Sequence, residues 1–545
     1  MKSLRSCISA LKVMSRPVRW RMLVSVLIGL LRIAASLTFV WTGKALVDVA
    51  TGDREGSLPW LIAFMVLVML VQLLAGLGGS YWERLSTTIC QNSLRYKYFS
   101  HVLRSSWNGK ESFHSGDSIN RLMEDVRVVT ELLCSRIPDV LITICQFLAA
   151  GTYLIILSPG LFWVVLLVIV VAVFSSKMFY KKMRLLTKEI REGESGIHQH
   201  MQENLQNRVL ALTLFGTDKV MSQMSQMQDT LVDNTVKRLN YNAVARGFMN
   251  GGFMLGYALA FAWGVVGIKN GSVTFGVMTA FLQLVGQVQR PVAELGSQVP
   301  AFIQAVTSIE RLTELSDLPG EEEGDPLMLD GAPGIRFSNV KFAYPGQERL
   351  VFDGFSHDFT PGCFAVVMGP TGVGKSTLIR LSLALLKPSE GSVSIYGSDG
   401  KEIPASPLTR CNFTYVPQGN SLISGTIRQN LLLAAPDADE AKMMEALDTA
   451  MADFVKDLPQ GLDTVCGESG SGLSEGQSQR IAIARALLHP SGVMILDEAT
   501  SALDSETERR LLGKLYDGFH GKKTIVFISH REAVTSMADT VLRLS

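Results

Sequence analysis

Six long apolar stretches within the first 300 residues constrain the fold of this chain more than any other feature. The stretches contain 16 to 21 residues each, and about 20 apolar residues cross the hydrocarbon core of a bilayer. Helices at the surface of a soluble domain keep a polar face, which these stretches lack. We therefore expect six membrane-spanning helices, with Lys177 and Arg290 snorkelling to extend the two shortest. The expected spans are Met22–Trp41, Pro59–Gly78, Pro138–Ser158, Leu161–Ser176, Phe248–Ile268 and Val273–Gln289.

The overall composition excludes several other classes of protein. Hydrophobic residues make up 47% of the chain and charged residues only 19%, below the roughly 25% of soluble proteins, so a disordered chain is excluded. The 51 basic and 50 acidic side chains nearly cancel, so no chain-wide positive field would attract nucleic acid. Seven cysteines without CxxC spacing favour neither a disulfide framework nor a zinc site.

The distribution of lysine and arginine predicts the orientation of the spans. With a cytoplasmic N-terminus, the inner side holds six basic residues in 1–21, eight in 79–136 and eleven in 177–247, whereas the outer side holds only Lys44, Arg54 and Lys269. Basic residues accumulate on the cytoplasmic side of membrane proteins, and the first apolar run is too long for a removable signal peptide. We therefore expect a multi-pass protein of the cytoplasmic (inner or plasma) membrane, with everything after about residue 290 in the cytoplasm.

The regions between and after the spans predict the domain organisation. The two internal loops, of 58 and 71 residues, are too long for structureless connectors, so we expect the spanning helices to continue beyond the bilayer. An acidic, turn-rich stretch around Glu321–Pro326 indicates a linker. The expected domains are a transmembrane domain at 1–314, a linker at 315–333 and a soluble domain at 334–545.

The soluble domain contains a phosphate-binding motif near its N-terminal end. The apolar run Ala365–Met368 predicts a buried strand, which leads through a glycine-rich loop into an expected helix at Thr377–Leu386, and the loop fills the pattern GxxxxGK[ST]. Backbone N–H groups and the helix N-terminus attract phosphate, Lys375 would reach the β and γ phosphates, and Ser376 would ligate Mg²⁺. We expect an α/β P-loop domain with ATP and Mg²⁺ as cofactors. The expected phosphate-binding residues are Gly369, Pro370, Thr371, Gly372, Val373, Gly374, Lys375, Ser376 and Thr377.

A second apolar run, Val493–Leu496, predicts a strand that ends in two carboxylates, Asp497 and Glu498. Asp497 is placed to hold Mg²⁺ through water, and Glu498 can polarise the attacking water as a general base. The pattern therefore predicts an ATPase rather than a protein that only binds nucleotide.

The segment Leu473–Gln477, with the sequence Leu-Ser-Glu-Gly-Gln, resembles the LSGGQ signature of ATP-binding cassette (ABC) proteins, and we expect a helix from Gln479 to Leu488 after it. Together with the phosphate loop and the Asp497–Glu498 pair, this segment identifies the chain as a member of that family. Spans followed by one nucleotide-binding domain are the order of an exporter-type half-transporter. The resemblance implies a multi-domain membrane protein, in which a six-helix, all-α domain of the type I exporter fold precedes an α/β P-loop domain.

The resemblance also implies roles for residues that the local patterns leave unassigned. Tyr344 resembles the aromatic residue that stacks on adenine, Gln418 the glutamine that senses Mg²⁺ and the membrane domain, and His530 the switch histidine that contacts the γ-phosphate. The segment Ser501–Asp504 resembles the D-loop of the family. In the signature and the D-loop, the residues implied to bind nucleotide are Ser474, Gly476, Gln477 and Asp504. The implied catalytic residues are Glu498, His530 and Gln418, and the implied Mg²⁺ ligands are Ser376, Gln418 and Asp497.

Other segments indicate which subclass of ABC protein the chain resembles. Thr464–Gly470 looks like the TxVGExG segment of exporters, and Phe113–Arg121 and Glu203–Phe215 look like the loop regions that carry coupling helices. Glu475 departs from the family, which usually has glycine there, and its carboxylate would repel an anion unless it points away. We expect activity to persist, because Ser474 and the Gly476 N–H are the expected phosphate donors.

The expected function is ATP-driven export or flipping of an amphipathic substrate, such as a lipid, a drug or a peptide-like molecule, by alternating access. The resemblance implies a homodimer or a heterodimer with a second half-transporter, because the signature of one nucleotide-binding domain closes over ATP held by the other. Two alternatives stay open. One is an ATP-gated channel or regulator, which Glu498 and the complete motif set disfavour, and the other is an importer with the exporter fold.

Polar residues within the spans suggest where a substrate would pass. Arg32 is the lone charge deep in the first span, and Gln283 and Gln287 recur on one face of the sixth, four positions apart. Charged groups inside membranes usually face a cavity or a partner. We therefore expect a substrate path at Arg32, Gln283 and Gln287, with an anionic amphiphile as the partner that Arg32 suits. Snorkelling at the interface is the alternative for Arg32, and the favoured interpretation of Arg290.

Overall fold

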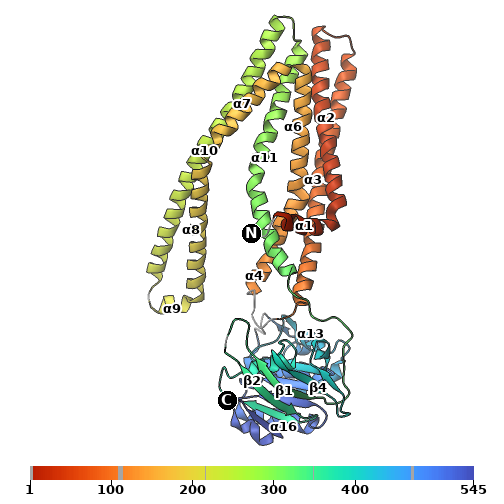
Figure 1. Cartoon of the computed structure of the whole chain (residues 1–545), viewed down its shortest axis with the longest axis vertical. Helices are drawn as coiled ribbons and strands as arrows, with labels where there is room; N and C mark the ends of the chain where they lie inside the picture. Colours follow the sequence, from red (N-terminus) through yellow and green to blue (C-terminus); the bar gives the residue numbers. More distant parts are fainter. Residues whose placement is uncertain (1–3, 108–114, 215, 348, 468–471) are drawn as a thin grey trace. The chain divides into compact units, whose positions relative to one another are not determined.

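A computed structural model describes residues 4–107, 115–214, 216–347, 349–467 and 472–545 (Figure 1). The chain divides into two compact units. We call Met1–Phe99 with Ile119–Ser316 the helical unit, and Ser100–Ser118 with Asp317–Ser545 the α/β unit. The short segment Ser100–Ser118, which interrupts the helical unit in sequence, therefore belongs to the α/β unit.

The helical unit is built from long helices that contain the six expected spans to within two residues. The long helices are α2 (Arg19–Thr51), α3 (Leu58–Leu103), α6 (Ile137–Leu157), α7 (Pro159–Lys177), α8 (Tyr180–Gln206), α10 (Thr217–Lys269) and α11 (Phe275–Ser316). The shorter ones are α1 (Leu4–Met14), α5 (Val126–Glu131) and α9 (Arg208–Thr213), and α4 (Ser115–Asn120) begins in the α/β unit and ends in the helical unit. Helix α10 packs along α7 and α8, and α11 packs along α2 and α6. As predicted, the internal loops are largely helical, because α3, α8 and α10 extend well beyond the apolar stretches.

The long helices differ in how well they suit a bilayer. Four of the described helical segments are long and apolar enough to cross a membrane, namely 16–51, 58–103, 118–157 and 217–269, and the bent pair of α7 and α8 makes a fifth. The sixth expected span lies in α11, which does not meet this measure because Gln283, Gln287, Gln289 and Arg290 interrupt its apolar run. Only 17% to 22% of the residues in the four apolar windows are buried, so most of their side chains face outward, as contact with lipid requires.

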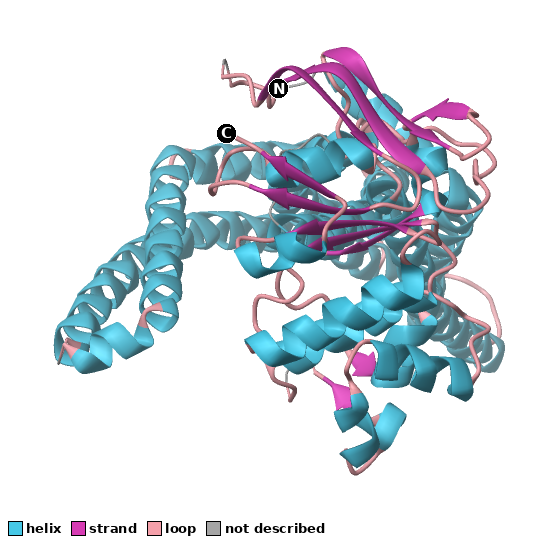
Figure 2. Ribbon diagram, turned by 90° about the horizontal axis from the view of Figure 1, so that it is seen from below, coloured by secondary structure: helices cyan, strands magenta, loops and turns pink. Residues whose placement is uncertain are grey.

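The α/β unit contains a five-stranded parallel sheet and a four-stranded antiparallel sheet. The parallel sheet has the order β11-β3-β10-β9-β6, the antiparallel sheet the order β2-β1-β4-β5, and β7 pairs with β8. Figure 2 shows these strands in magenta with helices beside them. The strands are β1 (Gly334–Phe342), β2 (Phe352–Phe359), β3 (Phe364–Met368), β4 (Glu390–Tyr396), β5 (Glu402–Pro404), β6 (Phe413–Val416), β7 (Gly425–Thr426), β8 (Val465–Cys466), β9 (Val493–Asp497), β10 (Thr524–Ile528) and β11 (Thr540–Arg543).

The three central strands explain why the functional loops lie together. Every residue of β3, β9 and β10 is buried, which is why these strands read as continuous apolar runs. Because the strands are parallel neighbours, their carboxyl ends meet at one edge of the sheet, where α/β folds bind ligands. The helices of this unit are α12 (Lys375–Ser382), α13 (Ile427–Leu432), α14 (Glu440–Thr449), α15 (Glu475–Leu488) and α16 (Ser505–Phe519).

The expected linker is anchored to the α/β unit by side chains from the region just before β6. The Asn412 amide accepts a hydrogen bond from Leu329 N at 2.7 Å and donates one to the Leu327 carbonyl at 2.7 Å. Arg410 pairs with Glu321 at 2.7 Å. This part of the chain therefore adopts a defined path along the α/β unit.

Three expected helix boundaries are wrong, namely the start and the end of α12 and the start of α15. Helix α12 begins two residues earlier than expected and ends at Ser382 rather than Leu386, because Ala384 has a φ of 48° that breaks the helix. Helix α15 begins at Glu475 rather than Gln479. Within the expected coupling regions, Phe113, His114 and Phe215 lie outside the described residues, as do 468–470 of the exporter segment. The flanking residues form α4, α9 and β8.

Candidate functional site

The phosphate loop connects β3 to α12 and depends on glycine at three positions. Gly369, Gly372 and Gly374 have φ values of 155°, 85° and 114°, which residues other than glycine rarely adopt. A Cβ on Gly374 would lie 2.8 Å from Val351 Cγ1, and one on Gly369 would lie 2.7 Å from the Leu544 carbonyl oxygen. Gly369 and Gly374 are therefore required by conformation and by space, and Gly372 by conformation alone.

Lys375 lies at the centre of this loop. Its side chain is 8% exposed, and its Nζ donates a hydrogen bond to the Gly369 carbonyl at 2.7 Å. The same Nζ lies 2.7 Å from Nε2 of His530, the residue two positions beyond β10. Burial lowers the pKa of Lys375, while the charge of Glu498 opposes that shift. The ammonium is thus largely shielded from water at the position where the motif predicts the terminal phosphates.

The end of β9 brings the two carboxylates to the same place. Glu498 Oε1 lies 2.9 Å from His530 Nε2, and Glu498 Oε2 accepts a hydrogen bond from Gln418 Nε2 at 2.7 Å. Lys375, His530, Glu498 and Gln418 therefore form one connected set of polar side chains, drawn from three strand ends and the loop after β6. The sequence predicted each of these residues separately, and the fold brings them together.

Asp497 precedes Glu498 and has a more enclosed environment. It is 7% exposed, and the Tyr415 hydroxyl donates a hydrogen bond to its Oδ2 at 3.2 Å. Burial raises the pKa of Asp497, and the Tyr415 hydrogen bond opposes that shift. No motif in the sequence indicated Tyr415, because it lies on β6, and only the strand order places β6 beside β9.

Tyr344 lies next to the phosphate-loop helix. Its hydroxyl is 3.0 Å from Thr377 Oγ1 and accepts a hydrogen bond from Arg380 Nη1 at 3.0 Å. The Arg380 guanidinium in turn lies over the Trp107 ring, 4.7 Å from its centroid. Trp107 comes from the segment Ser100–Ser118, and no motif in the sequence indicated its proximity to Tyr344. The expected adenine-contacting residue is therefore tethered to α12.

The signature residues cap a helix. Ser474 Oγ accepts a hydrogen bond from Gln477 N at 3.2 Å, and Gln477 Oε1 accepts one from Ser474 N at 2.9 Å. This capping box begins α15 four residues earlier than expected. Glu475 is exposed at the first helical position, where the helix dipole favours a carboxylate. A Cβ on Gly476 would lie 3.0 Å from the Ala502 carbonyl oxygen, so this position, unlike that of Glu475, has no room for a side chain.

Asp504 also has a capping role. Its Oδ1 accepts a hydrogen bond from Thr507 N at 2.9 Å at the start of α16, and hydrogen bonding to Thr507 lowers the pKa of Asp504. Within the described part of the chain, no hydrogen bond joins Ser474, Gly476, Gln477 or Asp504 to the phosphate loop. The structure of a single chain thus separates the expected nucleotide contacts into two groups, one around Lys375 and one at the starts of α15 and α16.

The expected substrate-path residues lie on two packed helices of the helical unit. Arg32 of α2 lines a cavity of about 280 Å³ together with Asp139 and Glu294, and a smaller one of about 70 Å³ with Asp139 and Glu83. Gln287 Nε2 donates a hydrogen bond to Ser36 Oγ at 3.0 Å. Gln283 lies against α2, with its Nε2 3.7 Å from the Cβ position of Gly43. Neither glutamine lines the two cavities around Arg32, so the three predicted residues do not form one surface.

Comparisons with known proteins agree with this architecture. The family described as the ABC transporter transmembrane region matches residues 22–292, and the ABC transporter family matches residues 352–501. The putative multidrug export ATP-binding/permease protein YgaD of Bacillus subtilis is 26% identical, covering 97% of this chain and 92% of the relative. The ATP-dependent lipid A-core flippase of Vibrio cholerae is 27% identical, covering 96% of this chain and 90% of the relative.

A solved structure extends the comparison to the fold. The structure of a bacterial Atm1-family ABC exporter with ATP bound matches with a TM-score of 0.77 and 24% identity, covering 97% of this chain and 94% of that chain. The helical unit and the α/β unit therefore have the type I exporter-like fold and the ABC nucleotide-binding fold. The chain belongs to the ATP-binding cassette transporters as an exporter-type half-transporter, in which a transmembrane region is fused to an ATP-binding domain whose ATPase activity is coupled to transport.

Proposed function

We propose that this protein exports or flips an amphipathic substrate across the cytoplasmic membrane by alternating access, using ATP hydrolysis at the strand ends of the α/β unit. The observation that carries the proposal is the connected set of Lys375, His530, Glu498 and Gln418 at the phosphate loop. The names of the relatives, a multidrug export protein and a lipid A-core flippase, support an amphipathic substrate.

The donor set at the phosphate loop fits ATP with Mg²⁺. The positive φ values of the glycines leave backbone N–H groups free to turn toward phosphate, and Lys375 supplies a shielded positive charge. Ser376 and Asp497 supply oxygen ligands of the kind Mg²⁺ prefers, and Gln418 is the third expected ligand. Mg²⁺ usually keeps several waters and substrate phosphates as ligands, so a cluster of three protein carboxylates, which the described residues do not contain, is not needed. When bound, Mg²⁺ would neutralise charge that develops on the phosphates.

Glu498 is the proposed general base. Its Oε1 faces His530 and its Oε2 faces Gln418, so the carboxylate is oriented from both sides. His530 Nε2 can accept a hydrogen bond from Lys375 or donate one to Glu498, but it cannot do both at once. Phosphate that draws Lys375 away would leave His530 free to donate to Glu498. This exchange of partners would couple the arrival of the terminal phosphate to the orientation of the base.

The signature residues support assembly with a second ATP-binding domain. Ser474 and Glu475 are exposed, and Gly476 is partly exposed, although α15 behind them is largely buried. A helix N-terminus with free N–H groups is suited to a phosphate, and among the described residues no hydrogen bond joins the start of α15 to the phosphate loop. We propose that it closes over ATP held by the other half of the dimer, either a second copy or a related half-transporter. Exposed Glu475 can turn toward solvent and leave that phosphate uncrowded.

The cavity around Arg32 refines the proposed substrate path. The hypothesis of an anionic amphiphile rested on Arg32 alone, but Asp139 and Glu294 line the same cavity. These two carboxylates offset the arginine charge, so the cavity is not a positive site, and the preference for an anion is not supported. An amphiphile with a polar head group remains the proposed substrate.

Substrate-stimulated ATP hydrolysis in proteoliposomes tests the proposal. We expect at least one member of a panel of lipids, drugs and peptides to raise turnover and to move across the bilayer only when ATP is present on the side of the α/β unit. Movement toward that side would favour the importer. Flux that continues down a gradient after ATP binds, without continued hydrolysis, would favour the channel. Protease accessibility of the N-terminus and the α/β unit tests the proposed cytoplasmic location of both.

A further inference from the structure

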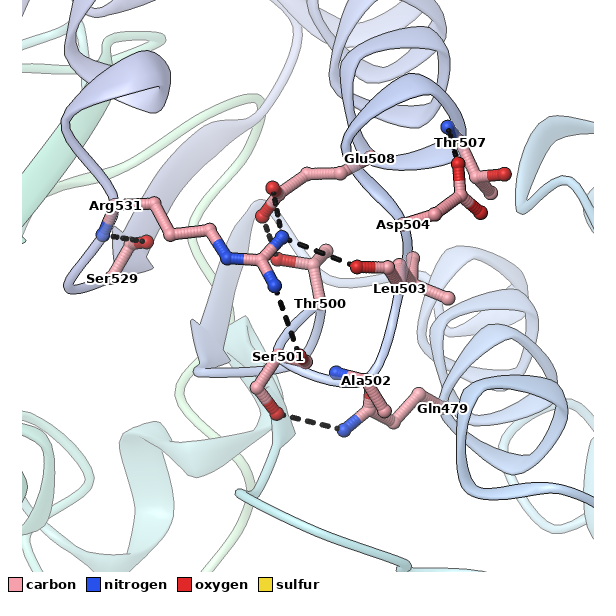
Figure 3. Close-up of polar contacts among 10 residues, drawn as sticks. All are labelled: Gln479, Thr500, Ser501, Ala502, Leu503, Asp504, Thr507, Glu508, Ser529 and Arg531. Carbon is pink, nitrogen blue, oxygen red and sulfur yellow. Dashed lines mark hydrogen bonds and ion pairs between the residues drawn. The ribbon is translucent and has the colours of Figure 1, made fainter.

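A buried carboxylate holds the loop between β9 and α16 (Figure 3). The Glu508 side chain, on the first turns of α16, is only 6% exposed. Its Oε1 accepts a hydrogen bond from Thr500 Oγ1 at 2.6 Å, and its Oε2 accepts one from Arg531 Nη1 at 2.5 Å. A buried charge is tolerated when it is paired and hydrogen-bonded. Glu508 therefore depends on both partners.

Arg531 also holds the backbone of the same loop. Its Nη1 donates to the Leu503 carbonyl at 3.2 Å, and its Nη2 donates to the Ser501 carbonyl at 3.1 Å. The planar guanidinium makes all these contacts at once, which a lysine ammonium cannot reproduce. Figure 3 shows the guanidinium between the loop and Glu508. One side chain thus joins α16, the loop and the segment after β10.

Gln479 of α15 fixes the loop from a different direction. Its Nε2 donates to Ser501 Oγ at 3.1 Å, and its Oε1 accepts a hydrogen bond from Ala502 N at 3.2 Å. Gln479 is only 1% exposed. The loop from Thr500 to Asp504 is therefore held by side chains from α15, α16 and the segment after β10.

Both ends of this network lead directly to the proposed catalytic groups. Arg531 follows His530 in the chain, and Thr500 lies two residues after Glu498. Glu498 has a φ of 49°. Residues other than glycine rarely adopt this backbone conformation, and it persists only where the surrounding structure holds it. The backbone on either side is held, because Glu498 N donates to the Ile528 carbonyl and Ser501 N donates to the Glu498 carbonyl, both at 3.1 Å. The Glu508–Arg531 pair stabilises the segments that follow Glu498 and His530.

We propose that Glu508 and Arg531 are positioning residues for ATP hydrolysis. Their ion pair joins the loop after Glu498 to the segment after His530, so that Glu498 Oε1 and His530 Nε2 keep their 2.9 Å contact. The inference rests on the proposed function, in which Glu498 and His530 act on ATP. Neither Glu508 nor Arg531 contacts the phosphate loop in the described structure, so they act through the two residues that do the chemistry.

The test uses Arg531→Lys and Glu508→Gln in the full-length protein in proteoliposomes. Arg531→Lys keeps the positive charge but removes the planar set of N–H donors of the guanidinium. Glu508→Gln keeps the shape of the side chain but removes its negative charge. Because misplacement of a catalytic group by about 1 Å costs up to about a hundredfold in rate, we expect kcat to fall roughly ten- to a hundredfold. The KM for ATP and the equilibrium affinity for ATP should stay within about twofold, since only the reacting geometry is lost. Turnover is expressed per ATP bound, so that a partly unfolded sample does not imitate the effect.

Matched controls come from the same helix. Arg509 and Glu506 form an exposed pair at 3.3 Å, with side chains 76% and 65% exposed. Arg509→Lys and Glu506→Gln should therefore retain the turnover of the unaltered protein. A positioning role is supported if only Arg531→Lys and Glu508→Gln lower kcat at constant ATP affinity.

Two other results would overturn the inference. One is unchanged turnover per bound ATP in both variants, and the other is a loss of ATP binding in both, which would make the pair a support of the whole fold. Glu498→Gln in the same assay distinguishes failure of the inference about Glu508 and Arg531 from failure of the proposed function. If Glu498→Gln is inactive while both positioning variants are normal, only the inference fails. If Glu498→Gln hydrolyses ATP at the normal rate, the assigned base itself is wrong.

Discussion

The ATP site and the cavity around Arg32 are built in different ways. At the ATP site, each functional group follows a buried strand, and the parallel order of β3, β10 and β9 brings the groups to one edge. The Arg32 cavity has single charged residues from α2, α6 and α11, which lie far apart in the sequence and belong to no motif. One site is made of contiguous segments, whereas the other exists only because helices pack.

This difference matches what each site must recognise. ATP is the same for every member of the family, so backbone N–H groups and short motifs can bind it. A transported substrate differs between members, and single side chains such as Arg32, Asp139 and Glu294 can set its charge preference without altering the fold. Substitutions at the two sites should therefore separate hydrolysis from substrate recognition.

The largest effect is expected for Glu498→Gln at the ATP site. Removing a general base costs roughly a hundred- to ten-thousandfold in rate, while the glutamine still fits between His530 and Gln418. ATP affinity should be unchanged and kcat should collapse. Single-turnover hydrolysis and ATP binding are measured on the same sample. Normal turnover would remove Glu498 from the mechanism.

The next largest effect is expected on the affinity for ATP, in the variant Lys375→Ala. Lys375→Ala removes the shielded ammonium that lies 2.7 Å from the Gly369 carbonyl and from His530. A hydrogen bond to a charged group contributes about 1.5–3 kcal/mol, and every 1.4 kcal/mol is about tenfold in affinity. We expect ATP to bind ten- to a hundredfold more weakly, measured by equilibrium titration. An exposed lysine such as Lys188 supplies the control, since Lys188→Ala should leave ATP affinity unchanged.

The Arg32 cavity should respond through the substrate and not through ATP. In Arg32→Gln, we expect basal ATP hydrolysis to be unchanged and the half-maximal substrate concentration to shift about tenfold. The direction reports the sign of the head group. An anionic substrate should bind more weakly, whereas a cationic one should bind more tightly, because Asp139 and Glu294 lose their counter-charge. Arg54→Gln, outside the cavity, is the control, and an unshifted response to every substrate would remove Arg32 from the path.

The smallest effect concerns the stability of the ATP site. Burial raises the pKa of Asp497, so folding favours the protonated form, and the free energy of unfolding falls as pH rises from the unfolded pKa through the folded one. Above that window the buried charge opposes folding. Asp497→Asn should therefore stabilise the nucleotide-free protein at neutral pH by roughly 1 kcal/mol, measured by thermal unfolding, and also lower Mg²⁺-dependent turnover. A lower melting temperature at neutral pH would contradict this.

The sequence predicted most of the local geometry of the candidate ATP site, because its motifs constrain the backbone. The glycines of the phosphate loop have backbone conformations that other residues disfavour, and the apolar runs before Gly369, Asp497 and His530 became the buried strands β3, β9 and β10. The start of α15 was misplaced because its capping residue, Ser474, lies inside a motif assigned to another purpose. Helix α12 begins at Lys375, inside the phosphate-binding motif itself.

Residues whose role depends on neighbours in space could not be predicted. Tyr415 reaches Asp497 only because β6 pairs with β9, and Trp107 reaches Arg380 only because Ser100–Ser118 belongs to the α/β unit. Likewise, nothing in the sequence around Arg32 indicated that Asp139 and Glu294 line the same cavity. These contacts join segments with no fixed spacing along the chain.

The amino-acid sequence by itself therefore determined the membrane character, the order of the two parts and the individual ATP-binding motifs, because apolar length, glycine placement and strand-to-loop spacing are local properties. The tertiary structure alone decided which side chains meet. It joined Lys375, His530, Glu498 and Gln418 into one set, placed Glu508 against Arg531, and offset the charge of Arg32 with two carboxylates. Such distances depend on how strands pair and helices pack, which spacing along a single chain does not specify.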